Sequence, residues 1–221
     1  MCFTTHSFIS ELAQSADAEK ALTMKAYMKS QFEFLGITTP DRRKVLKEYI
    51  KQNVINDRQE LEVIVKELWM LPEREFQYCA MEILMQYEKL WQQEMIDVIE
   101  YCLTNKSWWD TVDPLSYDCA GDYFKMYPGK IKSITGRWNA SKNIWLQRSS
   151  LLFQKKYKKD TDTILLAEYI SNLSASKEFF VQKSIGWILR EYAKTDADWV
   201  TTFVNTHALA PLSQREAMKH L

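Results

Sequence analysis

The feature of this sequence that most limits its fold is an internal repeat of about 35 residues. Aligning the chain with itself places six anchor positions at intervals of 37, 33, 36, 35 and 32 residues, namely Thr39, Phe76, Trp109, Trp145, Phe180 and Leu212. The last three anchors begin a similar string, with Gln two residues later and a basic residue three residues later. Such a period is typical of stacked helix pairs, each of which buries its apolar face only against its neighbours.

Helical periodicity runs through the whole chain. In residues 60–70, apolar Leu61, Ile64, Val65 and Leu68 recur at the spacing of one helical face. The segments 77–87, 144–157, 163–173 and 180–193 show the same spacing. Only five Gly and five Pro interrupt 221 residues, too few for the frequent turns of an all-β fold. We therefore predict an all-α solenoid of about six antiparallel helix pairs, forming a single domain over residues 1–221.

The repeat alignment also predicts which side chains share a surface. Four of the six positions that follow the anchors by three residues are basic: Arg42, Arg148, Lys183 and Arg215. Stacked repeats place equivalent positions side by side, so these cations would form a ladder along one concave side. Such a ladder fits the phosphates of a nucleic acid. The alternative is a solvated face that binds nothing.

Charge is unevenly distributed along the chain. The 29 basic and 29 acidic residues cancel, which alone argues mildly against a nucleic-acid partner. However, ten basic residues and no Asp or Glu lie between Lys125 and Lys159, whereas residues 57–100 carry eleven acidic and four basic residues. The neutral sum therefore conceals a basic segment that favours DNA binding.

Several other classes of protein are poorly supported. No phosphate-binding glycine loop is present, and the three histidines are isolated, so we expect no metal and no cofactor. The four cysteines form no C-x-x-C pair and are expected to be buried thiols in a reducing cytosol. No signal peptide is evident and no apolar run approaches the ~20 residues of a membrane span. We expect a cytoplasmic protein without a membrane partner, acting as a monomer.

One segment, residues 107–113, combines aromatic and acidic side chains. Trp109 and Asp113 are four residues apart and would share one helical face. An aromatic face beside a carboxylate suits a developing cation. The alternative places Trp109 in the core and Asp113 in solvent. Ser107 and Asp110 have the spacing of a helix-starting capping box. Pro114 then either distorts the helix or makes Asp113 the cap of a helix that begins there.

Three further residues allow two interpretations. Trp187 stands seven residues after its anchor, where other repeats have Leu46, Ile83 and Leu152, so core packing is the alternative to a place in a cleft. Arg190, one turn later, would reach the same edge. Tyr27 lies between basic neighbours and would either stack on a ligand or be an ordinary surface residue.

Taken together, several strings resemble the AlkD-like DNA alkylation repair glycosylases from about residue 27 to the C-terminus. They are residues 32–36 (FEFLG), 71–76 (LPEREF), 106–110 (KSWWD), 143–148 (NIWLQR), 177–183 (KEFFVQK) and 186–193 (GWILREYA). The resemblance implies a HEAT-like solenoid with duplex DNA along its concave face. It also implies excision of positively charged N3- and N7-alkylpurines without extrusion of the base into a pocket.

The same resemblance implies roles for individual residues. Trp109, Asp113 and Trp187 would form the catalytic cleft, Arg148 would contact the DNA backbone and Tyr27 would line the edge. Further DNA contacts are expected from Arg43, Lys156, Lys183 and Arg190. The nearest lysine in sequence to Asp113 is Lys106, which precedes the helix, so the enzyme is expected to be a monofunctional hydrolase. Two alternatives stay open: a non-catalytic protein that binds distorted or branched DNA, and a protein–protein scaffold.

Overall fold

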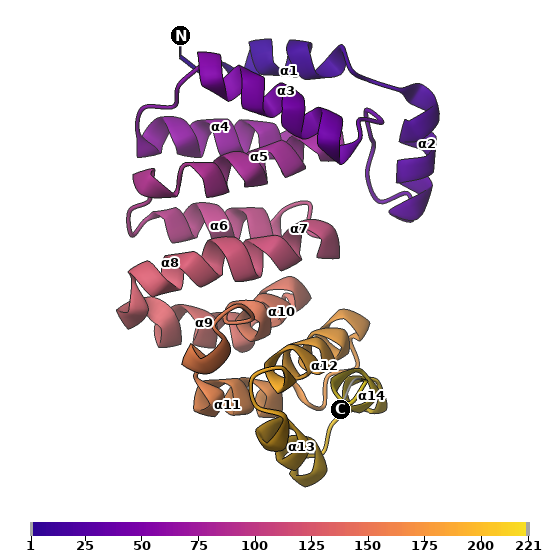
Figure 1. Ribbon diagram of the computed structural model, residues 1–221, viewed down its shortest axis with the longest axis vertical. Helices are drawn as coiled ribbons and strands as arrows, with labels where there is room; N and C mark the ends of the chain where they lie inside the picture. The colour runs from indigo at the N-terminus through magenta and orange to yellow at the C-terminus, as the bar shows by residue number, and fades with distance from the viewer. Residues whose placement is uncertain (1, 220–221) are drawn as a thin grey trace. The chain divides into compact units, whose positions relative to one another are not determined.

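The chain is built from helices, as expected. The computed structural model describes residues 2–219, in which helices α1 to α14 are joined by turns and loops, and extended segments pair only in two isolated bridges (Figure 1). The prediction of an all-α fold is confirmed. The helices are α1 (Thr5–Ala13), α2 (Ala18–Tyr27), α3 (Thr39–Gln52), α4 (Arg58–Met70), α5 (Arg74–Gln86), α6 (Met95–Thr104), α7 (Trp109–Pro114), α8 (Gly121–Met126), α9 (Ile131–Asn139), α10 (Ile144–Leu152), α11 (Thr163–Leu173), α12 (Phe179–Ala193), α13 (Ala197–Thr206) and α14 (Pro211–Ala217).

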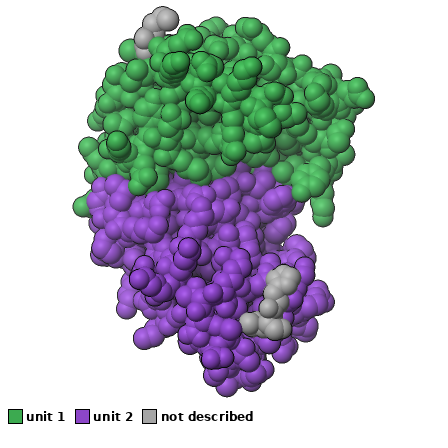
Figure 2. Space-filling model, in the orientation of Figure 1, with its two compact units in different colours: residues 1–98 green, residues 99–221 purple. Residues whose placement is uncertain are grey.

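The chain divides into two compact units, which are residues 1–98 and residues 99–221 (Figure 2). In the first unit, α4 and α5 pack together after a connection at residues 71–73 that reverses the chain. In the second unit, short connections at residues 140–143, 174–178 and 207–210 separate α9 from α10, α11 from α12 and α13 from α14. Reversal after so few residues produces antiparallel helix pairs.

The anchors of the repeat fall at equivalent structural positions. Each lies within the first three residues of a helix, in α3, α5, α7, α10, α12 and α14 respectively. In the second unit these helices contact one another in sequence, α7 with α10, α10 with α12, and α12 with α14. These helices therefore pack as one series, and this arrangement builds the site described below.

Apolar faces and caps follow the sequence pattern. Leu61, Ile64, Val65 and Leu68 are all buried, as the periodicity of α4 predicts. Six helices begin after an Asp, Asn or Thr whose side chain accepts backbone N–H groups of the first turn: Asp17, Thr38, Asp57, Asn143, Asp162 and Asp196. Three of the four cysteines are buried thiols, but Cys2 is exposed, so the expectation was wrong there.

Two details of the predicted helices were wrong. Ser107 does not cap α7, because its hydroxyl donates to the carbonyl of Leu103 (2.7 Å) and Trp108 holds the N-cap position. The helix expected over 144–157 ends at Leu152, after which the chain turns so that the hydroxyl of Tyr157 reaches the carbonyl of Gly121 (2.6 Å). The first of these bonds satisfies a carbonyl in the last turn of α6.

Pro114 is accommodated without ending the helix. It stands inside α7 with helical backbone angles, and the chain continues as a π-helix over Leu115–Ala120 and then as α8. Proline has no N–H to donate one turn back, and the helix departs from α geometry directly after it. Asp113 is thus a helix residue distorted from its C-terminal side, not a cap.

None of the helices that residues 2–219 form is both long and apolar enough to cross a membrane.

Candidate active site

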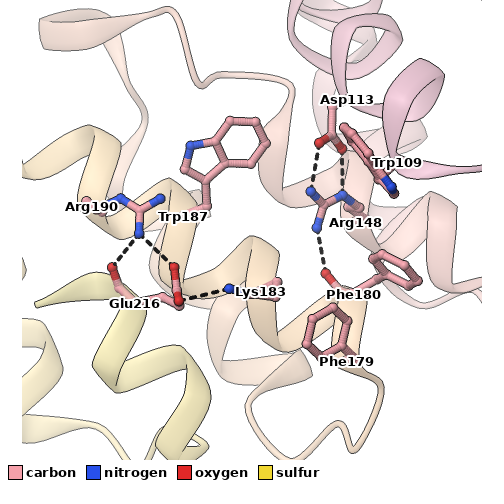
Figure 3. Close-up of a pocket in the computed structure, with 9 residues that line it drawn as sticks. All are labelled: Trp109, Asp113, Arg148, Phe179, Phe180, Lys183, Trp187, Arg190 and Glu216. Atoms are coloured by element: carbon pink, nitrogen blue, oxygen red, sulfur yellow. Dashed lines mark hydrogen bonds and ion pairs between the residues drawn. The ribbon is translucent and has the colours of Figure 1, made fainter. Parts of the chain in front are cut away.

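A cleft of about 330 Å³ opens between four helices of the second unit (Figure 3). Its lining comes from α7, α10, α12 and α14 and consists of Trp109, Asp113, Arg148, Phe179, Phe180, Lys183, Trp187, Arg190 and Glu216. The three residues expected to form a catalytic cleft, Trp109, Asp113 and Trp187, therefore line one cavity in the second unit.

Asp113 is held rigidly by Arg148. The guanidinium donates from Nε to Oδ1 (2.6 Å) and from Nη2 to Oδ2 (2.9 Å), and its Nη1 donates to the carbonyl of Phe180 (2.7 Å). Asp113 is 7% exposed and Arg148 5% exposed. A bidentate pair of this kind fixes the plane of the carboxylate. Each carboxylate oxygen keeps room for a further donor, such as a water molecule. The alternative that Asp113 is a solvent-exposed helix residue is wrong.

Two tryptophans flank this ion pair. Trp109 lies beside the carboxylate of Asp113, and Trp187 projects from α12 across the cleft (Figure 3). Both are half-buried, whereas Leu46, Ile83 and Leu152 at positions equivalent to Trp187 are buried in the core. Trp187 is therefore a cleft residue, and the core interpretation does not hold for it.

Neighbouring rings and cations hold Trp187 in place. Its ring meets Tyr117 of the π-helix edge to face, with centroids 6.2 Å apart. The ammonium nitrogen of Lys155 lies 4.4 Å from the centroid of Trp187 and 4.1 Å from that of Tyr117. Burial lowers the pKa of Lys155. The sequence interpretation missed both Tyr117 and Lys155, since neither stands at a repeated position.

An aromatic cluster supports the entrance of the cleft. Trp108, Trp145 and Phe180 contact one another, with centroids 4.8 to 5.8 Å apart. Two of the three are repeat anchors, so the repeat itself brings these rings together. Phe179, next to the cluster, is 55% exposed and adds an apolar surface at the edge.

Lys183 and Arg190 share one partner that the sequence interpretation missed. Glu216 of α14 accepts from Lys183 Nζ and from Arg190 Nη1, each at 2.8 Å. These two cations lower the pKa of Glu216 to about 2. In the sequence the lysine nearest to Asp113 is Lys106. In the structure the lysine that lines the cleft with Asp113 is Lys183.

Several other expected DNA contacts are engaged in ion pairs within the protein. In the segment 125–159, Lys125, Arg137, Arg148 and Lys156 pair with carboxylates that lie earlier in the chain: Asp122, Glu100, Asp113 and Asp118. The segment contains no acidic residue, yet packing supplies them from outside it. The surface that this segment forms with its acidic neighbours is therefore less positive than the sequence of the segment alone indicates.

Tyr27 and Arg43 belong to the first unit. Arg43 pairs with Glu82 (2.8 Å), which also binds the buried Arg42 of the predicted basic ladder. Tyr27 is 71% exposed and borders a second, largely apolar cavity of about 370 Å³. Their roles in DNA binding stay predictions.

The paired carboxylates predict an acid-sensitive fold. Arginine and lysine partners lower the pKa of Glu82, Glu100 and Glu216 below their usual values. Groups with a lowered folded pKa stabilise the protein above their unfolded pKa, and that contribution disappears as pH falls. We expect Tm to fall as pH decreases from about 5 to about 2, and to fall less steeply in Glu216→Gln, as followed by circular dichroism. Superimposable curves of Tm against pH for the two proteins would contradict this.

No group of three or more His, Cys, Asp or Glu side chains in residues 2–219 is arranged to hold a metal ion. The lining of the cleft consists of two carboxylates, four aromatic side chains and three cations, which together suit a cationic sugar joined to phosphates.

Comparisons with known proteins show a family and a fold that this chain shares. A family model described as "DNA alkylation repair enzyme" matches residues 8–221. A solved structure from Enterococcus faecalis, described as a predicted DNA alkylation repair enzyme, is similar with a TM-score of 0.87 and 32% identity, covering 94% of this chain and 97% of that one. The smu.31 protein of Streptococcus mutans UA159 shares the fold, with a TM-score of 0.61 and 15% identity over 95% of this chain and 99% of that one. No curated protein matches the sequence.

Proposed function

The chain belongs to the DNA alkylation repair enzyme family, and from this membership and the cleft we propose that it is a DNA glycosylase for N3- and N7-alkylated purines in duplex DNA. It would hydrolyse the N-glycosidic bond and leave an abasic site and the free base. The observation that carries the proposal is the carboxylate of Asp113, fixed by Arg148 between Trp109 and Trp187.

Positively charged alkylpurines suit this cleft because a cationic base is already a good leaving group. Alkylation at N3 or N7 makes the purine cationic, and breaking the bond returns the electron pair to the base and neutralises it. A general acid for the base is therefore unnecessary. What the enzyme must stabilise is the positive charge that develops on the deoxyribose. A carboxylate and two indole faces can do this.

Water completes the reaction in this proposal. Asp113 accepts a hydrogen bond from a water molecule and orients its oxygen toward C1′ of the deoxyribose. The C1′–N bond breaks, a C1′–O bond forms, and the proton released from water passes to the carboxylate or to solvent. Arg148 is a positioning residue in this scheme, because it fixes the plane of the carboxylate.

The lining of the cleft supports excision without extrusion of the base. Enzymes that flip a base read its Watson–Crick edge through hydrogen bonds. The nine lining residues are aromatic or ion-paired, and none of them is an Asn, Gln, Ser or Thr that would suit such readout. Contact with the sugar and its phosphates is therefore favoured over capture of the base.

The experiment that tests the proposal is release of bases from methylated DNA. Incubation with DNA treated with a methylating agent is expected to release 7-methylguanine and 3-methyladenine, identified by mass spectrometry. Tight binding of DNA without any released base would favour the non-catalytic alternative. Absence of both DNA binding and release would favour the protein–protein scaffold.

We also expect the enzyme to be monofunctional. A lysine nucleophile would form a Schiff base with the sugar, which borohydride traps as a covalent adduct. Lys183 lines the cleft, but its ammonium nitrogen is bound to the carboxylate of Glu216 and is not held toward Asp113. We expect no trapped adduct on denaturing gels. An adduct that disappears in Lys155→Met would overturn this assignment and identify the lysine beside Trp187 as the nucleophile.

A further inference from the structure

Glu216 neutralises part of the positive charge at the edge of the cleft. Its Oε1 binds Lys183 and its Oε2 binds Arg190, and its backbone carbonyl accepts a second bond from Arg190 Nη1 (3.0 Å) (Figure 3). Two cations and one carboxylate leave a net charge of one at this place. Without Glu216 the same two side chains would present a charge of two.

Asp113 and Glu216 occupy equivalent positions in the repeat. Each stands four residues after an anchor, and each binds a basic residue that stands three residues after the anchor of a neighbouring repeat: Arg148 for Asp113 and Lys183 for Glu216. The pairs differ in accessibility. The side chains of Lys183 and Arg190 are 36% and 22% exposed, whereas that of Arg148 is 6% exposed. A phosphate can therefore approach the cations at Glu216 more readily.

Close packing keeps Glu216 beside these cations. The hydroxyl of Ser213 donates to the carbonyl of Gln182 (2.9 Å), which ties α14 to α12. A Cβ on Gly186 would lie 2.4 Å from the Cβ of Glu216 and 2.7 Å from the carbonyl oxygen of Ser213. The absence of a side chain at Gly186 therefore lets α14 lie directly on α12. The backbone of Glu216 is fixed, and only its side chain can leave Lys183 and Arg190.

We propose that Glu216 competes with DNA phosphates for Lys183 and Arg190 and thereby limits the electrostatic affinity of the protein for duplex DNA. The inference rests on the proposed function, in which these cations face DNA. Carboxylate and phosphate oxygens bind the same donors, so a phosphate that approaches must displace Glu216. Binding to undamaged duplex is mainly electrostatic and is weakened directly by this competition. Damaged and undamaged duplexes carry the same phosphates, so Glu216 lowers the salt-dependent part of the affinity for both.

Salt-dependent binding to undamaged duplex tests this inference. Glu216→Gln removes the competing charge, so it is expected to bind more tightly at low salt than the wild type. The slope of log K against log salt should steepen by about 0.9 for each cation released to a phosphate, up to about 1.8. Glu168→Gln is the matched control, because Glu168 is exposed on α11, does not line the cleft and changes net charge equally.

The outcomes separate this inference from the proposed function. A wild-type protein that does not bind DNA would refute the proposed function itself. If the wild type binds with a salt-dependent affinity and Glu216→Gln behaves like Glu168→Gln, the inference is wrong. If Glu216→Gln releases both cations, adding Lys183→Met should remove about half of the increase in the slope of log K against log salt, because only Arg190 is then left to bind a phosphate. If Glu216→Gln does not fold, Glu216→Asp, which withdraws the carboxylate by one methylene, should give an intermediate slope, and a wild-type slope would overturn the proposal.

Discussion

Replacing Asp113 with Asn is expected to slow single-turnover release of 7-methylguanine by roughly 100- to 1,000-fold. A positioned acid–base group contributes about 10²–10⁴-fold to a rate, and the lability of the lesion places the loss toward the lower end. The change keeps the shape of the side chain but removes its negative charge. It also presents an amide N–H₂ to one of the two Arg148 donors, so the plane of the side chain is less firmly held.

Binding and a matched control separate this effect from unfolding. DNA affinity of Asp113→Asn should equal or slightly exceed that of the wild type, because a carboxylate near phosphates repels them. Asp160→Asn removes the same charge from an exposed turn that does not line the cleft, and should leave excision unchanged. Wild-type release by a folded Asp113→Asn would show that the carboxylate is structural and that the mechanism is wrong.

Replacing Arg148 with Met is expected to reduce the free energy of unfolding by about 3–5 kcal/mol. The change leaves Asp113 nearly buried without its partner, and an uncompensated buried charge costs that much. The carbonyl of Phe180 loses a donor as well. Urea denaturation followed by circular dichroism measures the loss, which is a large part of the stability of an ordinary domain.

A second substitution shows whether the loss comes from the unpaired charge. Adding Asp113→Leu to Arg148→Met removes the buried carboxylate, so the double variant should be more stable than Arg148→Met alone. Equal stability of the two variants would show that the destabilisation comes from lost packing of the arginine. The predicted phosphate contact of Arg148 is compatible with this pairing, since a guanidinium has five N–H groups and three are used here.

Much of the fold could be predicted because it repeats. Equivalent anchors at Trp109, Trp145 and Phe180 follow from sequence spacing alone, and each is the first or second residue of a helix in the structure. Helix ends were less predictable. Ser107 has the spacing of a cap, but its hydroxyl bonds the preceding helix, and Pro114 is absorbed by a π-turn. Both outcomes depend on which backbone group lies nearest after packing.

The site divides in the same way. Trp109 and Asp113 share a helical face, so their proximity follows from a spacing of four residues. Their approach to Trp187 depends on the contact of α10 with α7 and with α12. The acidic partners of Lys183 and Lys156 could not be predicted, because they too depend on how the helices pack. Glu216 and Asp118 are ordinary acidic residues in the sequence, and only packing brings them to Lys183 and Lys156.

The most direct test of the central claim compares two duplexes that differ in one charge. One carries cationic 7-methylguanine, and the other carries its uncharged analogue 7-methyl-7-deazaguanine at the same place. If the cleft acts by stabilising the sugar and leaves departure to the charge of the base, the wild type should release 7-methylguanine and leave the analogue attached. Release of both bases at similar rates would contradict the account, because it would require a general acid that the proposed mechanism lacks. Release of neither, with both duplexes bound, would contradict it as well.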